Sequence, residues 1–242
     1  MRRYMGMAVG LALGLSACNT QSALTEHQQL PPAPVLTLAD VVPVTQPATP
    51  EAKANQEKFM QENITRFRSR ALASAYYVLQ AQRAFREEKL DSATHFFSRA
   101  YLMDSTNNDI FRGYGLVYGQ QQRYDEALFV LYHALENDRD NPLLLNDIAT
   151  SHLSRFYITS NPEDLLQSRK LLEKAAQLSP DEADVYYKLA INSYYLQEYG
   201  NAWSYLHKSL RRNRAVADKA FISALLEKQQ DPQGEFTPEL GQ

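Results

Sequence analysis

The stretch from Phe111 to Asn141 reads FRGYGLVYGQQQRYDEALFVLYHALENDRDN, and it decides the fold. Bulky apolar residues recur three and four positions apart in each half, which predicts two helices that each carry one apolar stripe. Gly115 and Ala127 are the small residues of these stripes, and they let the two helices approach closely. A hairpin this small cannot bury its own apolar faces, so further copies are expected at the same spacing.

The small residue at the start of the second apolar stripe can be used to align the copies of the hairpin. It falls at Ala93, Ala127, Ser168 and Ala202, so that successive copies lie 34, 41 and 34 residues apart. The longer interval contains seven extra residues around 155–164. We expect them to form a longer connection between the two helices of the third copy, with a helix starting at Asn161-Pro162-Glu163-Asp164. Inserted residues in solenoids map to loops on one face, so Phe156 and Tyr157 either pack within that loop or contribute to binding.

The order F-x2-Y-G-x2-Y, then A-x3-L-x2-A, resembles the tetratricopeptide repeat (TPR), a helical hairpin of 34 residues. The resemblance implies an all-α fold, a right-handed α-solenoid of about four TPR hairpins. It covers about 140 residues, and single copies depart from the pattern, as at Gln80, where an apolar residue is usual. The array is expected over 71–215, with repeats at about 74–107, 108–141, 142–182 and 183–215.

Helices that cover the two ends of the array are also expected, because terminal repeats need closing elements. Residues 51–70 are rich in helix formers, carry a stripe of Phe59, Ile64 and Phe67, and predict an N-terminal covering helix. Residues 216–242 predict a closing helix followed by a frayed tail after Asp231-Pro232-Gln233-Gly234. The closing helix would bury Phe221, Ile222, Leu225 and Leu226.

The N-terminus has the parts of an export signal: two arginines, a short apolar run and Leu15-Ser16-Ala17-Cys18. The run is too short to span a bilayer. The ending resembles the lipobox of bacterial lipoproteins, which implies a signal peptide over 1–17 and acylation of Cys18, for example by palmitate. Asn19 in place of aspartate then implies the outer membrane, at its periplasmic face. An ordinary cleaved signal with an incidental cysteine is the alternative.

Residues 18–50 follow as the lipidated cysteine and a proline-rich linker. The linker holds six of the eleven prolines and two formal charges, so it buries too little apolar surface to fold, and disorder is expected. The weaker alternative is that Val35–Val42 forms a short docking strand.

Nothing in the sequence selects an enzyme. The net charge of −3 argues against a nucleic-acid partner. The histidines lack the i, i+4 pairing of a zinc site, and no G-x-S-x-G is present. Gly113, Gly115 and Gly119 do not match the dinucleotide fingerprint in spacing or context. We therefore expect no catalytic residues, no metal and no cofactor.

What remains is a surface. The resemblance implies that the first helices of successive repeats line a concave groove that binds a protein or peptide. Leu116 stands where the family's carboxylate clamp has asparagine, so capture of a terminal carboxylate is not expected. The groove positions between the packing residues are Gln82, Arg112, Leu116, Asn146, Thr150, Tyr187, Ile191 and Tyr194.

The function expected is that of a lipid-anchored periplasmic adaptor or scaffold, such as a platform for cell-wall enzymes. An assembly factor for an outer-membrane machine, such as the type IV pilus secretin, is one alternative, and a regulatory subunit of an envelope enzyme is another. The sequence indicates no oligomeric state.

Overall fold

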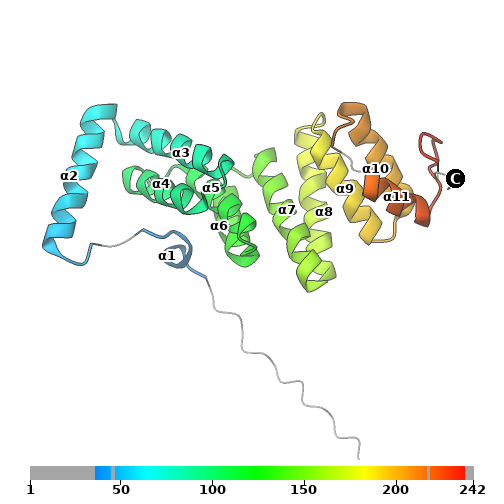
Figure 1. The fold of residues 1–242 in the computed structure, drawn as a ribbon, viewed down its shortest axis with the longest axis horizontal. Helices are drawn as coiled ribbons and strands as arrows, with labels where there is room; N and C mark the ends of the chain where they lie inside the picture. Colours follow the sequence, from blue (N-terminus) through cyan, green and yellow to red (C-terminus); the bar gives the residue numbers. More distant parts are fainter. Residues whose placement is uncertain (1–35, 45–46, 217–218, 238–242) are drawn as a thin grey trace, which may run out of the picture. The chain divides into compact units, whose positions relative to one another are not determined.

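The computed structural model describes residues 36–44, 47–216 and 219–237. The expected signal peptide and Cys18 lie outside these residues. Every regular element in the described ranges is a helix (Figure 1). The helices are α1 (Leu38–Val41), α2 (Pro50–Phe67), α3 (Arg70–Arg86), α4 (Leu90–Met103), α5 (Asn108–Gln120), α6 (Tyr124–Asn137), α7 (Pro142–Thr159), α8 (Pro162–Leu178), α9 (Ala183–Tyr195), α10 (Tyr199–Arg212) and α11 (Lys219–Lys228).

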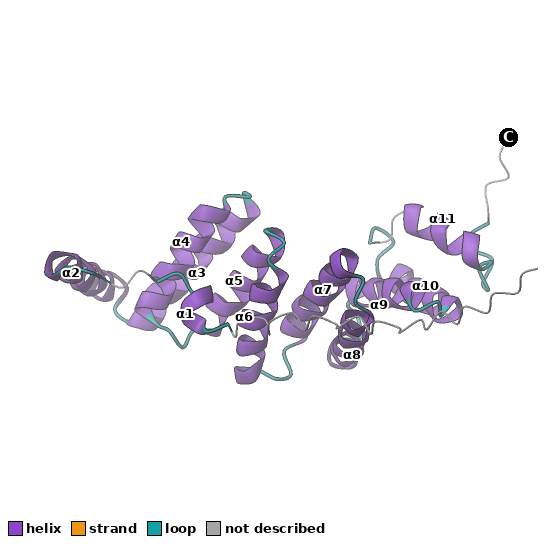
Figure 2. Ribbon diagram, turned by 90° about the horizontal axis from the view of Figure 1, so that it is seen from below, coloured by secondary structure: helices purple, strands orange, loops and turns teal. Residues whose placement is uncertain are grey.

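Four helical hairpins follow one another: α3 with α4, α5 with α6, α7 with α8, and α9 with α10 (Figures 1 and 2). This confirms the predicted α-solenoid. The four residues that set the repeat, Ala93, Ala127, Ser168 and Ala202, are all 0% exposed. At Gly115 an added Cβ would lie 2.3 Å from the Leu131 Cγ of α6, so the hairpin contact requires glycine.

The turn inside each hairpin contains one left-handed residue. These residues are Glu88, Gln122, Ser160 and Gln197, with φ between 55° and 61°. In the first, second and fourth turns the next amide donates to a carbonyl five residues back, such as Arg123 N to Tyr118 O at 2.9 Å. That bond satisfies a carbonyl at the helix end and reverses the chain.

The seven extra residues of the third repeat lengthen its helices instead of its loop. Helix α7 has 18 residues against 13 in α5, and α8 has 17 against 14 in α6. The expected long connection is therefore wrong, since Ser160 and Asn161 alone separate the two helices. The expected helix start is right: the Asn161 side chain accepts from Glu163 N, and Pro162 occupies the first turn.

The N-terminal covering helix α2 packs on α3. Phe59 and Phe67 of the expected stripe contact Tyr77 and Tyr76, at 5.8 Å and 4.7 Å between ring centroids. The buried residue of α2 is polar, however: Asn63 accepts a hydrogen bond from the Tyr77 hydroxyl at 2.8 Å. A buried asparagine is tolerated because this bond and one from its amide to Phe59 O satisfy it.

The closing helix α11 buries Leu225 against the array. The expectation of a frayed tail is wrong for residues 229–236. His207 Nε2 lies 2.7 Å from Asp231 Oδ1, Trp203 Nε1 donates to Gln229 O, and the Phe236 ring stacks on Trp203. These contacts cover the indole and imidazole, which would otherwise face solvent at the end of the array.

The proline-rich segment departs from the expected linker over Leu36–Val44, which we call the docking segment. It contains the single turn α1, and it is a helix where the alternative prediction had a strand. Val41 and Val42 are buried, and Tyr118 donates a hydrogen bond to Val41 O at 2.6 Å. The segment therefore packs on the array instead of hanging free of it.

Candidate functional site

Two adjoining cavities lie between α3, α5 and α7, along the first helices where the sequence predicts a groove. They share Phe85 and Leu116, and we call them the polar section of the groove. The first has a volume of about 220 Å³ and is lined by Gln82, Phe85, Arg86, Phe97, Asp109, Arg112, Gly113 and Leu116. The second has a volume of about 250 Å³ and is lined by Phe85, Gly115, Leu116, Gly119, Gln120, Tyr124, Asp147, Thr150, Ser151 and Ser154.

The central charges of the polar section are paired with each other. Arg112 Nε of α5 donates to Asp147 Oδ2 of α7 at 2.7 Å, with 30% and 15% of the two side chains exposed. Burial raises the pKa of Asp147, and the positive charges of Arg112 and Lys188 oppose that rise. The pair ties the second repeat to the third and leaves the Asp147 carboxylate partly desolvated.

A second polar network continues the groove from α7 to α9. Lys188 Nζ lies 2.6 Å from Asp184 Oδ2 and donates to Asn146 Oδ1 at 3.1 Å, while the Asn146 amide donates to Asp184. The Thr150 hydroxyl donates a hydrogen bond to Asn146 O at 2.7 Å. Asn146 and Thr150 are therefore half-buried and already hydrogen-bonded, and a ligand would meet the edge of this network.

An aromatic section follows at the C-terminal ends of α7 and α9. Tyr195 lies 5.2 Å from Phe156 and 5.5 Å from Tyr157 between centroids, both edge to face. Tyr157 is 51% exposed and Tyr195 43% exposed. Burial of part of the ring and the nearby Tyr195 hydroxyl raise the pKa of Tyr157, so the phenol stays neutral at physiological pH. We define the aromatic section as Phe156, Tyr157, Tyr187, Tyr194, Tyr195 and Phe221.

Tyr187 and Tyr194 contact the closing helix. The Phe221 ring of α11 lies 5.6 Å from Tyr187 and 5.7 Å from Tyr194 between centroids. Tyr194 also contacts Tyr195 and Tyr199. Both rings are half-buried, as is Ile191 between them, so part of each is covered by the chain itself.

The groove also contains residues that the sequence did not indicate. Phe85 joins the two cavities, and Tyr195 carries the exposed ring next to the selected Tyr194. Asp147 follows Asn146 in the sequence, and the local pattern does not show that Asp147 is the one that faces Arg112. Arg112 and Asp147 are 35 residues apart, about one repeat. A search for opposite charges at that spacing on successive first helices would identify the pair.

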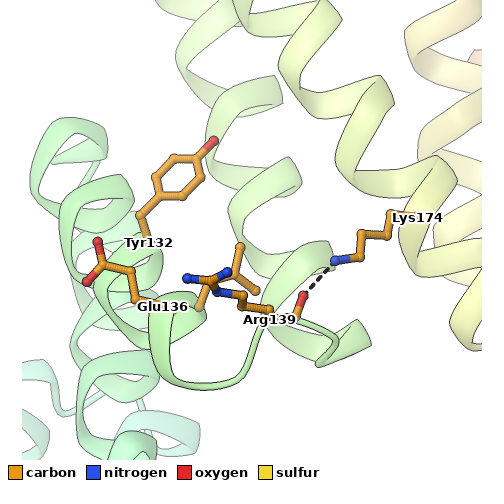
Figure 3. Close-up of a pocket in the computed structure, with 5 residues that line it drawn as sticks. Tyr132, Glu136, Arg139 and Lys174 are labelled. Carbon is orange, nitrogen blue, oxygen red and sulfur yellow. Dashed lines mark hydrogen bonds between the residues drawn. The ribbon is translucent and has the colours of Figure 1, made fainter.

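The opposite face carries a cavity of about 310 Å³ between α6 and α8 (Figure 3). Arg139 and Lys174 border it, and Lys174 Nζ donates to Arg139 O at 2.8 Å. Next to this cavity, the Tyr132 hydroxyl forms a hydrogen bond with His152 Nε2 at 2.9 Å. The other ring nitrogen, His152 Nδ1, forms a hydrogen bond with the Asp164 carboxylate at 2.7 Å. Burial raises the pKa of Tyr132 and lowers that of His152, so both side chains favour their neutral forms.

The described part of the chain offers neither a metal cluster nor a membrane span. Residues 36–44, 47–216 and 219–237 contain no cluster of three or more metal-ligating side chains. None of the helices in the same ranges has the length and apolar content needed to cross a bilayer.

Comparison with solved structures agrees with the arrangement of hairpins. PilF of Pseudomonas aeruginosa aligns with a TM-score of 0.57 at 22% identity, over 70% of this chain and 79% of its own. The chain has the fold of a tetratricopeptide-repeat solenoid. TTC0263, a TPR protein of Thermus thermophilus, aligns at 0.54 and 14% identity, over 64% of this chain and 80% of its own. YrrB, described as a TPR protein with an unusual peptide-binding site, aligns at 0.51 and 16% identity, over 72% and 94%.

At these identities the likeness concerns the fold alone. No protein-family model matches the chain, and no curated protein sequence matches it.

Proposed function

We propose that the protein is a non-enzymatic adaptor that binds a segment of another protein in the groove on its first helices. The observation that carries this is the aromatic section, where Tyr157 and Tyr195 expose large, stiff side chains beside a hydrogen-bonded polar wall. Rings of this kind supply much of the energy in protein interfaces because they lose little side-chain entropy on binding. The peptide-binding site named for YrrB supports the same use of this fold.

The polar section favours an extended ligand with polar side chains at one end. Its cavities hold about 220 Å³ and 250 Å³, which suits single side chains instead of a whole small molecule. Arg112 and Asp147 are paired, so the net charge at the centre is near zero and a strongly charged ligand is not selected. Leu116 lies between the cavities and supplies an apolar contact for a ligand that crosses from one to the other.

We place the adaptor at the outer membrane, on its periplasmic face, through acyl chains on Cys18. The support is the Leu-Ser-Ala-Cys ending of an apolar N-terminal run and the Asn19 that follows it. Two or more acyl chains hold a protein stably on a bilayer. Cys18→Ala should yield an unprocessed or soluble protein without labelled fatty acid. A variant that still carried the label and sedimented with outer membrane would contradict the anchor.

Two partners fit this placement: a cell-wall enzyme held on a platform, and a component of an outer-membrane machine such as the type IV pilus secretin. A regulatory subunit of an envelope enzyme is the further alternative. The experiment is a pull-down from envelope extract with the full mature protein, beside a variant in which the exposed Tyr157 and Tyr195 are alanine. The proposal expects one envelope protein to be lost from the variant. Its identity separates the roles, and hydrolysis of cell-wall polymer by the pure protein would contradict the non-enzymatic role.

A further inference from the structure

The docking segment Leu36–Val44 is bound to the array like a short peptide ligand. Val41 is 0% exposed and Val42 5% exposed, although both belong to the proline-rich stretch 19–50. Two array side chains bind its backbone: Tyr118 donates to Val41 O at 2.6 Å, and Ser98 donates to Pro43 O at 2.9 Å. Asp40 closes the turn by accepting from the Thr37 amide and hydroxyl. Burial of the two valines and hydrogen bonds to two backbone carbonyls thus hold the docking segment on the array, at Val41 and again at Pro43.

The segment lies on the face opposite the groove. Ser98 belongs to α4, and α1 also contacts α6, which are both second helices (Figure 1). Tyr118 is the contact from a first helix, α5. The groove cavities are lined mainly by α3, α5 and α7, which are first helices. We call the side of α4 and α6 the outer face. The chain therefore enters the folded body on the outer face of the first two repeats, before it reaches α2.

We infer that the docking segment is a strap that turns the outer face of repeats one and two toward the membrane and leaves the groove open to the periplasm. This rests on the lipid anchor of the proposed function. Seventeen residues, 19–35, separate Cys18 from the docking segment, a reach of at most about 60 Å. Were the segment free, the first fixed point would be α2 at Pro50, with 31 residues, 19–49, between it and Cys18 and a reach of about 110 Å.

The arrangement has two consequences for a bound partner. The tether reaches the folded body at the first two repeats instead of at the end of the array, which biases their outer face toward the bilayer. Docking also shortens the tether by nearly half, which raises the effective concentration of the groove near the membrane surface. A partner is then received from the periplasmic side.

Energy transfer from labelled lipid headgroups to a dye on the lipidated full-length protein tests this. The dye is placed at Glu136 or at Asp109 through cysteine substitutions. Both positions are exposed and belong to the second repeat, Glu136 beside the outer-face cavity and Asp109 beside the groove. Energy transfer should be larger to the dye at Glu136 than to the dye at Asp109.

In Val41→Asp/Val42→Asp this difference in transfer should be lost, because the docked site cannot hold two carboxylates away from water. Ala39→Asp, at an exposed position of α1, adds charge without that effect and should keep the difference.

The outcomes separate the strap from the anchor. Equal transfer at the two positions in the unchanged protein, or a difference that survives Val41→Asp/Val42→Asp, would overturn the strap while the protein still floats with vesicles. Failure to float with vesicles at all would overturn the anchor and the strap together. Tyr118→Phe deletes the hydrogen bond to Val41 O and leaves the ring. It should reduce the difference without lowering the helix content, which excludes unfolding as the cause.

Discussion

The polar and aromatic sections of the groove are built in different ways. The polar section lies largely on repeats of regular length, and its central charges, Arg112 and Asp147, satisfy each other. The aromatic section depends on the longer third repeat: Phe156 and Tyr157 stand near the end of α7, which exceeds α5 by five residues. Two of its rings, Tyr157 and Tyr195, remain exposed. We therefore expect the aromatic section to supply affinity and the polar section to set the register of the ligand.

The largest effect on stability is expected at Asp164, which binds residues of α7 near the aromatic section. The Asp164 side chain is 2% exposed and binds both His152 and Arg155. Asp164→Ala removes this buried acceptor, although Arg155 keeps Asp125 and His152 keeps Tyr132, and should lower the free energy of unfolding by about 2–3 kcal/mol. Asp147→Ala is the matched change in the polar section, where the pair is more exposed, and should cost about 1–2 kcal/mol. Thermal unfolding of both variants measures these losses of stability. Equal losses would contradict the claim that the two sections are built in different ways.

The next effect concerns binding. Tyr195→Ala should weaken affinity for the groove partner by about 2 kcal/mol, or some thirtyfold, because it removes an exposed ring from the centre of the aromatic section. Gln82→Ala in the polar section should weaken it less. Titration of the partner identified by pull-down measures both. Ser204→Ala on α10, at an exposed position, is the control and should bind normally. A larger loss for Gln82→Ala would reverse the roles of the sections.

Packing beneath the polar section gives a third test. Gly115→Leu would place side-chain atoms where Leu131 lies and should cost roughly 1–3 kcal/mol, with the loss shared along the array. Gly119→Ala is the matched control on the same helix, because an added Cβ there meets no atom within 4 Å. It should raise stability by about 0.5–1 kcal/mol, since alanine favours the helix. An unchanged melting temperature in Gly115→Leu would show that the α5–α6 contact is misplaced.

The smallest effect is a pH dependence in the third repeat. Burial lowers the pKa of His152, while the Asp164 carboxylate opposes this, and Arg155, Glu163 and Tyr132 also face the ring. A lowered histidine pKa means that stability is complete above about pH 6.5 and is lost as the pH falls below it. The melting temperature should therefore drop between about pH 7 and pH 5, and drop less in His152→Gln.

His95 provides the control for this pH dependence. Its pKa is also lowered by burial, but its side chain is exposed on α4. His95→Gln should change the pH dependence less than His152→Gln does. Identical profiles for His152→Gln and the unchanged protein would exclude His152 as the titrating group.

The repeat register was predictable because it is periodic. Small residues at Ala93, Ala127, Ser168 and Ala202 admit one packing solution, and the structure buries all four. The location of the seven extra residues in the third repeat was not predictable, because repeat length alone does not say whether extra residues enter a loop or a helix. Residues 153–159 carry apolar side chains that extend α7 over its neighbours, which local sequence rules do not reveal.

Segments that depend on tertiary contacts were also beyond sequence reasoning. Val41 and Val42 are buried because they pack into the apolar core of the array, where Tyr118 and Ser98 also donate to the carbonyls of Val41 and Pro43. The tail is held in the same way, by Trp203 and His207, two residues whose place on the last repeat became clear only with the fold. Short segments of this kind have no periodicity of their own.

The central claim is that a partner lies in the groove on the first helices. A photoreactive residue at 112 or 195, compared with 204 on α10, tests it in intact cells. Lys208 serves less well as the comparison, because its ammonium lies over the rings of Tyr186 and Tyr205. The account predicts capture of one envelope protein from 112 and 195, and none from 204. Capture from 204 with nothing from 112 or 195 would place the partner on the outer face and contradict the account.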